Sequence, residues 1–305
     1  MNTKSNTIFT DNFPECKNDK ELAEAIELFP QYDPYYVVSG CLQDRKEFFD
    51  LLWGKFEPYA DRHFNDQIKV SFHQRSREMY MGKTLLDNNL SIKSNNEWPD
   101  FIINDHVYIE CVACTKGDSE SNTVPEMHCT KYPDLICLQE TPTDKMILRI
   151  TSVIQDKAIT QYDWWKKKSR LNKDAPFIIA INTGDLGHSQ TGLILKALFG
   201  MGNLRINRNG ERGHERKDNI PKWNGSPISV NYFTASEYNF ISGILWSDKY
   251  ILNMEENDNF ILVNNPYAIN PINMNDFLFW EQWRAEQQEN WITLNHYKKN
   301  TEQHH

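Results

Sequence analysis

The stretch that decides the fold is Pro99-Asp-Phe-Ile-Ile-Asn-Asp-His-Val-Tyr-Ile-Glu-Cys-Val-Ala113. Two runs rich in apolar and β-branched residues flank the polar segment Asn104-Asp-His106, a pattern typical of a β-hairpin. If these three residues form the loop, Asp100 lies directly opposite Glu110 and on the same face. A two-residue loop would instead point the two side chains to opposite faces, so the hairpin makes a prediction about register.

The two carboxylates of this hairpin have the chemistry of a metal site. Opposed Cβ atoms would be about 5 Å apart, close enough for Asp100 and Glu110 to share one cation. Because Glu110 stands among Ile109, Cys111 and Val112, we expect a strand buried on both faces, where a carboxylate without a partner costs several kcal/mol. Magnesium prefers such hard oxygen ligands, so the hairpin predicts a site for Mg²⁺ or Mn²⁺.

Apolar periodicity predicts a mixture of helices and strands around the hairpin. The expected helices are residues 20–29, 42–59, 64–88, 151–171 and 191–199, and a Trp- and Glu-rich one from Asp276 to about 294. The expected further strands are 146–150, 177–181, 228–233, 241–245 and 260–263. Strand 146–150, the following helix and strand 177–181 form a βαβ pattern, which predicts a parallel crossover and therefore a mixed sheet.

Composition limits the class of protein. The chain has 305 residues and a net charge of −9, which argues against a protein that coats nucleic acid indiscriminately. Local basic patches occur at residues 166–173 and 205–222. With no apolar run of about 20 residues and six unevenly spaced cysteines, we expect a cytoplasmic protein with reduced thiols and no membrane partner.

The order of several short motifs resembles a known family. Glu78 on a helix precedes Pro99-Asp100 and Ile109-Glu110, and a helix and a buried strand follow, as in the core of PD-(D/E)XK nucleases. Over residues 64–272 the chain is similar to a largely uncharacterised prokaryotic branch of that superfamily. The motifs of this narrower likeness are Phe72-His-Gln-Arg75, Glu78-Met-Tyr80, Pro99-Asp-Phe101, Ile109-Glu110, Leu148-Arg-Ile-Thr151, Lys157, Pro176–Asn182 and Asn265–Ala268.

The resemblance implies an α/β fold with a restriction-endonuclease-like core, in which helices flank a central mixed β-sheet. It divides the chain into an N-terminal polar and helical segment (1–62), the nuclease-like core (63–275), and a C-terminal helix and tail (276–305). The function implied is a Mg²⁺-dependent phosphodiesterase acting on DNA, specifically an endonuclease. Asp100 and Glu110 would bind the metal and Glu78 would assist.

One position departs from the family pattern. The Glu-X-Lys motif would place a lysine two residues after Glu110, where this chain has Val112. Lys157 is our preferred replacement and Lys116 the alternative. Contacts to nucleic acid are expected from Lys116, Arg149, Gln161, Lys166 and Lys167. Loss of the lysine also leaves open a catalytically inactive module on the same fold that binds nucleic acid or a protein partner.

Other interpretations of the sequence carry less weight. Cys111, Cys114, His128, Cys129 and Cys137 suggest zinc, but residues three apart on a strand face opposite sides. Ser189 follows a predicted buried strand, although its surroundings lack the second glycine of a nucleophile elbow.

The C-terminal segment and the partners leave further alternatives. The Trp-rich C-terminal helix could dock a partner through a stripe formed by Phe277, Trp280, Trp283 and Trp291. A homodimer, or a partner protein from a defence-type system, also stays open.

Overall fold

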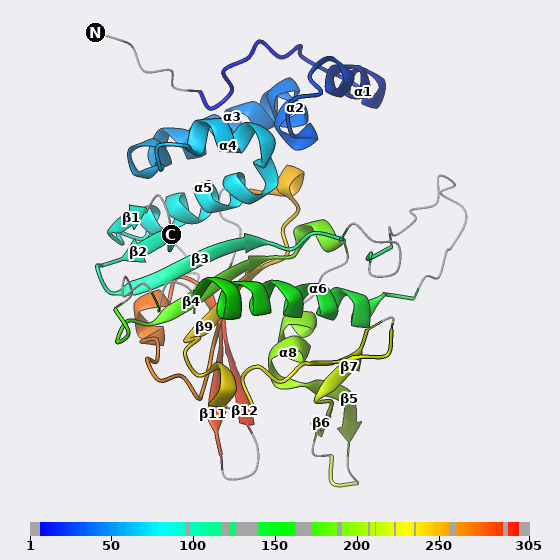
Figure 1. Cartoon of the computed structure of the whole chain (residues 1–305), viewed down its shortest axis with the longest axis vertical. Helices are drawn as coiled ribbons and strands as arrows, with labels where there is room; N and C mark the ends of the chain where they lie inside the picture. The colour runs from blue at the N-terminus through cyan, green and yellow to red at the C-terminus, as the bar shows by residue number, and fades with distance from the viewer. Residues whose placement is uncertain are drawn as a thin grey trace, which may run out of the picture. The chain divides into compact units, whose positions relative to one another are not determined.

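In the computed structural model the chain divides into two compact units. Figure 1 traces its helices and strands. The first comprises Met1–Ala113 and Lys249–Asp258, and the second comprises Cys114–Asp248 and Asn259–His305. The structure describes residues 7–94, 98–117, 123–125, 140–162, 167, 172–187, 191–206, 208–210, 212–222, 224–234, 236–255, 260–288 and 292–298, with the backbone alone at 159–161 and 191.

The first unit contains a layer of short helices. They are α1 (Asp19–Leu28), α2 (Pro34–Cys41), α3 (Gln43–Phe56), η1 (Glu57–Tyr59), α4 (Phe64–Val70), α5 (Phe72–Asp87) and the 3₁₀ turn η5 (Ile251–Asn253). The helices predicted at 20–29 and 42–59 are confirmed, whereas the one predicted at 64–88 is interrupted at Ser71. Helix α2 was not predicted, since a proline commonly ends a helix and Pro34 stands at the start of this one. Pro34 occupies the first turn of α2, where its missing N–H costs nothing.

One carboxylate joins two of these helices at their N-termini. Asp33 accepts hydrogen bonds from the backbone N–H of Tyr35 in α2, at 2.8 Å, and of Phe72 in α5, at 2.9 Å. Both are N–H groups of a first helical turn, which lack partners within their own helix. Because Ser71 makes no side-chain cap, Asp33 supplies the cap for α5 and thereby fixes where this helix begins.

The first unit also holds three antiparallel strands, β1 (Ile92–Ser94), β2 (Phe101–Ile103) and β3 (Val107–Ala113). Phe101 pairs with Ile109 and Ile103 with Val107. The loop therefore has three residues, and its first two, Asn104 and Asp105, adopt positive φ values of 49° and 58° that these residue types tolerate. The predicted register is confirmed.

The second unit is built on a mixed sheet. Its strands are β4 (Phe177–Asn182), β9 (Gly243–Ser247), β10 (Ile261–Asn264), β11 (Glu281–Gln287) and β12 (Ile292–Tyr297), adjacent in that order. The pairs β4–β9 and β10–β11 are parallel, and β9–β10 and β11–β12 are antiparallel. All six residues of β4 are buried, as its continuous apolar run predicted. The α/β class and the mixed sheet are thus confirmed.

The predicted strand at 146–150 is wrong. These residues lie in helix α6 (Thr143–Gln155), which continues into a π-helical segment, η2 (Asp156–Tyr162). The buried residues Met146, Ile147, Ile150 and Ile154 recur every three or four positions, so the apolar run is one stripe of a helix. The helix consequently begins at Thr143 rather than near Thr151, and the predicted βαβ unit loses its first strand.

The prediction of a C-terminal helix is also wrong. After a 3₁₀ turn, η6 (Met274–Phe277), the chain forms the antiparallel hairpin β11–β12. Across the hairpin the rings of Trp283 and His296 stack with centroids 4.5 Å apart, and His296 Nε2 lies 2.6 Å from a carboxylate oxygen of Glu281. Pairing of β11 with β10 has overridden the local preference for helix.

Smaller elements complete the second unit. They are η3 (Gly184–Leu186), α8 (Thr191–Phe199), β5 (Met201–Ile206), β6 (Arg212–Arg216), β7 (Asn219–Pro221), β8 (Pro227–Ser229) and η4 (Ser236–Tyr238). The helix predicted at 191–199 and strands near 241–245 and 260–263 are confirmed, while the strand predicted at 228–233 is shortened to β8. None of the described helices is both long enough and apolar enough to cross a bilayer.

Candidate metal centre

The β2–β3 hairpin brings two acidic residues together in the first unit. Continuing its register by one residue beyond Phe101–Ile109 sets Asp100 opposite Glu110. Glu110 is 5% exposed although it is a carboxylate, and Asp100 is half-buried. One oxygen of Asp100, Oδ2, accepts a hydrogen bond of 2.7 Å from the backbone N–H of Cys111. The backbone of β3 therefore orients the Asp100 carboxylate.

Glu78 lies in the same unit and is paired with a cation. It belongs to α5, is 2% exposed, and its Oε2 lies 2.6 Å from Nη1 of Arg75. The same nitrogen contacts Oδ2 of Asp61 at 3.1 Å, and the guanidinium lies over the ring of Phe64. One partly buried guanidinium thus bridges two carboxylates that are far less exposed than ordinary surface acids.

The protonation of Glu78 reflects these surroundings. Burial raises its pKa well above the usual value, and the negative charge of Asp100 raises it further, while Arg75 pulls it down. For Arg75, burial by itself would lower the pKa, but the charges of Glu78, Asp61 and Asp100 outweigh burial and raise it. Glu78 and Asp100 are therefore close enough to repel one another, and Arg75 remains charged.

A glutamine holds the end of β3 against α5. The side chain of Gln74 donates to the carbonyl of Cys111 at 2.9 Å and accepts from the N–H of Ala113 at 2.7 Å. The amide side chain makes the same two-point contact that a neighbouring strand would make. This contact positions the strand that carries Glu110 relative to the helix that carries Glu78.

The predicted basic residues belong to the second unit. Lys157, at the start of η2, and Lys116 are half-buried, and Lys167 is exposed. The guanidinium of Arg149 donates to the carbonyl and the hydroxyl oxygen of Thr115, at 2.8 and 3.2 Å. Lys166 and the side chain of Gln161 lie outside the described residues.

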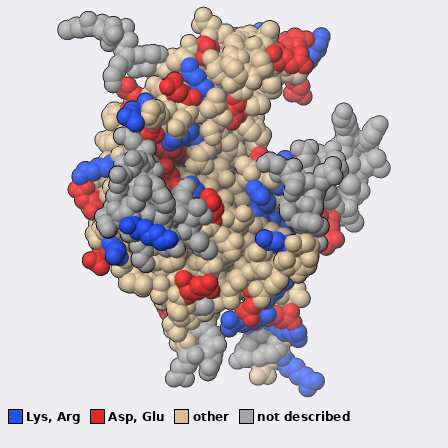
Figure 2. All heavy atoms as spheres, viewed as in Figure 1, with Lys and Arg blue, Asp and Glu red and all other residues tan. Residues whose placement is uncertain are grey.

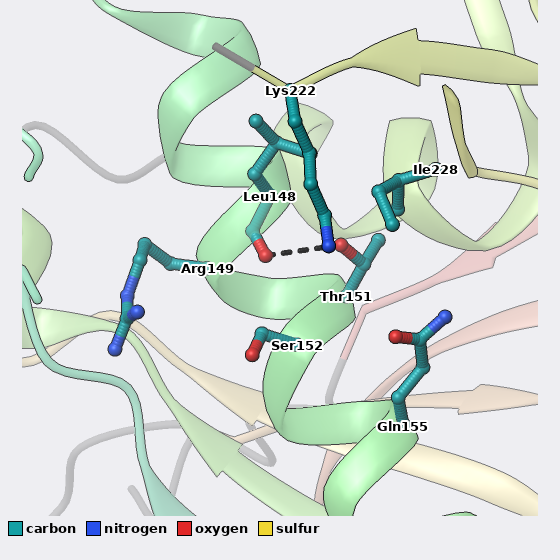
Figure 3. A pocket seen from close by; sticks show the side chains of 7 residues that line it. All are labelled: Leu148, Arg149, Thr151, Ser152, Gln155, Lys222 and Ile228. Atoms are coloured by element: carbon teal, nitrogen blue, oxygen red, sulfur yellow. Dashed lines mark hydrogen bonds between the residues drawn. The ribbon is translucent and has the colours of Figure 1, made fainter. Parts of the chain in front are cut away.

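A small cavity of about 150 Å³ lies beside α6 in the second unit. Its lining consists of Leu148, Arg149, Thr151, Ser152, Gln155, Lys222 and Ile228. Figure 3 shows Lys222 extending toward Leu148, whereas the guanidinium of Arg149 points away from the other lining residues. Arg149 contributes its stem to this cavity, because its charged end is directed to Thr115.

The other chemical alternatives gain no support from the described part of the chain. Within it, no three His, Cys, Asp or Glu side chains are grouped closely enough to hold a metal ion, and this holds for Glu78, Asp100 and Glu110 as well. Cys111 and Cys114 are both buried. The remaining residues considered for zinc or serine chemistry, His128, Cys129, Cys137 and Ser189, lie outside the described residues.

Arg75, Asp61 and Gln74 are the residues of this centre that the sequence did not reveal. Arg75 and Glu78 are three residues apart, a spacing at which ion pairs form on a helix surface, but that spacing does not indicate that Glu78 is buried. Searches against protein-family models, curated proteins and solved structures found no match.

Proposed function

We propose that this protein is a Mg²⁺-dependent phosphodiesterase that cleaves DNA as an endonuclease. Asp100 and Glu110 are the proposed metal ligands, and Glu78 assists through water. The observation that carries the proposal is the register of β2 and β3, which sets the two carboxylates opposite one another. A slip of one residue would have separated them onto the two faces of the sheet.

The donor set suits magnesium. This ion is commonly held by one or two carboxylates, with water and substrate phosphate in the other positions, so a pair of acids is sufficient. Mn²⁺ accepts the same oxygen ligands. When bound, the ion would supply charge stabilisation at the scissile phosphate. The Cys111 N–H holds Asp100 in place, and Gln74 holds the strand bearing Glu110, so the ligands are oriented by the protein itself.

The cation that acts on the attacking water needs a separate assignment. Val112 stands where the family motif has lysine, and Arg75 is already engaged with Glu78 and Asp61. We therefore assign the role of positioning or polarising the attacking water to Lys157, with Lys116 as the alternative. Arg149, Gln161, Lys166 and Lys167 would contact the phosphates of DNA.

The direct test is cleavage of supercoiled, linear and single-stranded DNA in Mg²⁺ or Mn²⁺. Asp100→Asn keeps an oxygen for the Cys111 N–H but removes the charge, so we expect cleavage and Mn²⁺ binding to be lost. The matched control is Asp105→Asn on the same hairpin, which should retain both. Cleavage that persists in Asp100→Asn and in Glu110→Gln would refute the assignment.

A second candidate function is a binding module that has lost cleavage. It is favoured by Val112 and by Arg75, which already supplies positive charge to Glu78. This function predicts affinity for DNA that decreases steeply with salt, together with no product in either metal. Mn²⁺ binding that requires Asp100 would count against it, and so would any product that requires Lys157.

A further inference from the structure

The hairpin formed by β5 and β6 is a separate two-stranded sheet in the second unit (Figure 1). Leu204 pairs with His214 and Ile206 with Arg212, while the register shifts between Met201 and Leu204. From Asn203 to Ile206 every residue of β5 is exposed. An isolated two-stranded ribbon is at best marginally stable, so such exposure calls for an explanation.

The ribbon concentrates positive charge in an acidic chain. Residues 201–217 contain four arginines, one lysine and two glutamates, which gives +5 − 2 = +3, whereas the whole chain carries −9. Lys and Arg side chains gather at the lower right of Figure 2, where Figure 1 shows β5 and β6, with acidic groups among them. The ribbon therefore attracts polyanions although the whole molecule repels them.

The charges are not equally placed for binding. At the base of the ribbon, Arg216 and Lys217 form ion pairs with Asp218 and Asp144. Arg205 pairs with Glu215. Toward the tip, Arg208 and Arg212 are both exposed.

One face of the ribbon combines apolar and basic groups. Because directly opposed residues share a face, Leu204 and Ile206 lie beside His214 and Arg212. Leu204 and Ile206 are 54% and 60% exposed. Aliphatic side chains next to arginine match the base edges of a groove, where thymine methyl groups and phosphates lie close together.

We propose that the β5–β6 ribbon enters the major groove of double-stranded DNA and anchors the protein on a duplex. This inference rests on the proposed function, because it specifies the form of nucleic acid that the chain takes. Six residues of strand extend about 20 Å, and paired strands lie about 4.8 Å apart. A ribbon of that width fits the major groove, which is about 12 Å wide.

The test measures the affinity of the full-length protein for a duplex as a function of salt, without divalent metal. In Arg208→Ala/Arg212→Ala, removal of two phosphate contacts should reduce the slope of log K against log salt by about 1.8. If the effect vanishes at 1 M salt, this slope corresponds to a loss of about 60-fold at 0.1 M. The matched control Lys17→Ala/Lys20→Ala removes two exposed charges from the first unit and should change neither quantity.

A second variant distinguishes groove entry from charge attraction. Leu204→Ser/Ile206→Ser should weaken duplex binding without changing the salt slope, and methyl green, a major-groove ligand, should displace the protein where the minor-groove ligand netropsin does not. The proposal is overturned by equal losses in the lysine control, by undiminished binding in the serine variant, by equal affinity for single strands, or by absence of duplex binding. Capture of an acidic protein in place of DNA also overturns it.

Cleavage separates this inference from the proposed function. If the unaltered protein binds the duplex through the ribbon but yields no product in Mg²⁺ or Mn²⁺, the ribbon assignment stands and the nuclease assignment falls. If cleavage requires Asp100 but is unaffected by the ribbon variants at 0.1 M salt, the ribbon assignment falls.

Discussion

Replacing Arg75 with methionine removes the guanidinium that contacts Glu78 at 2.6 Å and Asp61 at 3.1 Å, while keeping an unbranched side chain. The side chains of Arg75 and Glu78 are 18% and 3% exposed, so Glu78 is buried and Arg75 is partly buried. Removing one partner of a buried pair typically costs about 3–5 kcal/mol. Asp61 also accepts a hydrogen bond from the His63 N–H, so Asp61 keeps one partner and contributes less to the cost of removing Arg75. We expect about 3 kcal/mol when Glu78 is ionised.

This cost should depend on pH in a definite direction. The folded-state pKa of Glu78 is raised above 4.5, chiefly by burial, and loss of Arg75 raises it further. Between the unfolded and folded pKa values the folded protein holds more protons, so stability decreases as pH rises. Below the folded pKa of the unaltered protein, Glu78 is protonated in both proteins, so Arg75→Met loses only the contacts with Asp61 and Phe64. Above it, the cost grows by up to about 1.4 kcal/mol per pH unit until the variant also ionises.

A double-mutant cycle with Glu78→Gln measures this coupling. Urea unfolding, followed by circular dichroism at pH 5, 7 and 9 in buffer containing a chelator, gives the free energy of unfolding of each protein. We expect the coupling to increase from pH 5 to pH 9, because the Arg75 charge stabilises Glu78 only when Glu78 is ionised. As a control, Arg216→Met breaks an exposed pair and should cost at most about 1 kcal/mol. A cost of Arg75→Met that is equal at all three pH values, or unchanged in Glu78→Gln, would refute this electrostatic account.

Three further perturbations test other parts of the structure. Gln74→Leu should destabilise the protein by about 1–3 kcal/mol and accelerate hydrogen exchange at the Ala113 amide, because both backbone partners lose their contact. Burial raises the pKa of the Cys114 thiol to about 12, so iodoacetamide at pH 8 should label it in urea but leave it unmodified in the folded protein, as peptide mass analysis would show. Truncation after Trp280 removes β11 and β12 and uncovers an edge of β10, so it should yield insoluble or unfolded protein rather than a stable core.

The hairpin could be predicted because its determinants are local. Asn104 and Asp105 tolerate the left-handed backbone of the loop, and the apolar runs on either side fix which residues face the core. The same reasoning failed at 146–150, because a short apolar run suits a strand as well as one face of a helix. Only the longer window that includes Ile154 shows the helical period.

The C-terminal hairpin shows a different limit. Residues 276–294 are rich in side chains that favour helix, and no turn signal separates them as clearly as Asn104-Asp105 separates β2 from β3. Their strand conformation follows from pairing with β10, a partner about twenty residues earlier in the chain. Position in the sheet decided the conformation, and a local window does not contain that information.

Part of the candidate centre could likewise be predicted from local sequence and part could not. This difference bears on which residues are the proposed metal ligands. Asp100 and Glu110 follow from register alone, whereas the contacts of Arg75 with Asp61 and Glu78 require helix packing. Because burial and Asp100 raise the pKa of Glu78, and Arg75 already occupies its carboxylate, Glu78 is poorly suited to bind a cation directly. An indirect role through water is compatible with both facts. The proposed divalent cation would therefore be held by Asp100 and Glu110 themselves, with Glu78 acting only through water.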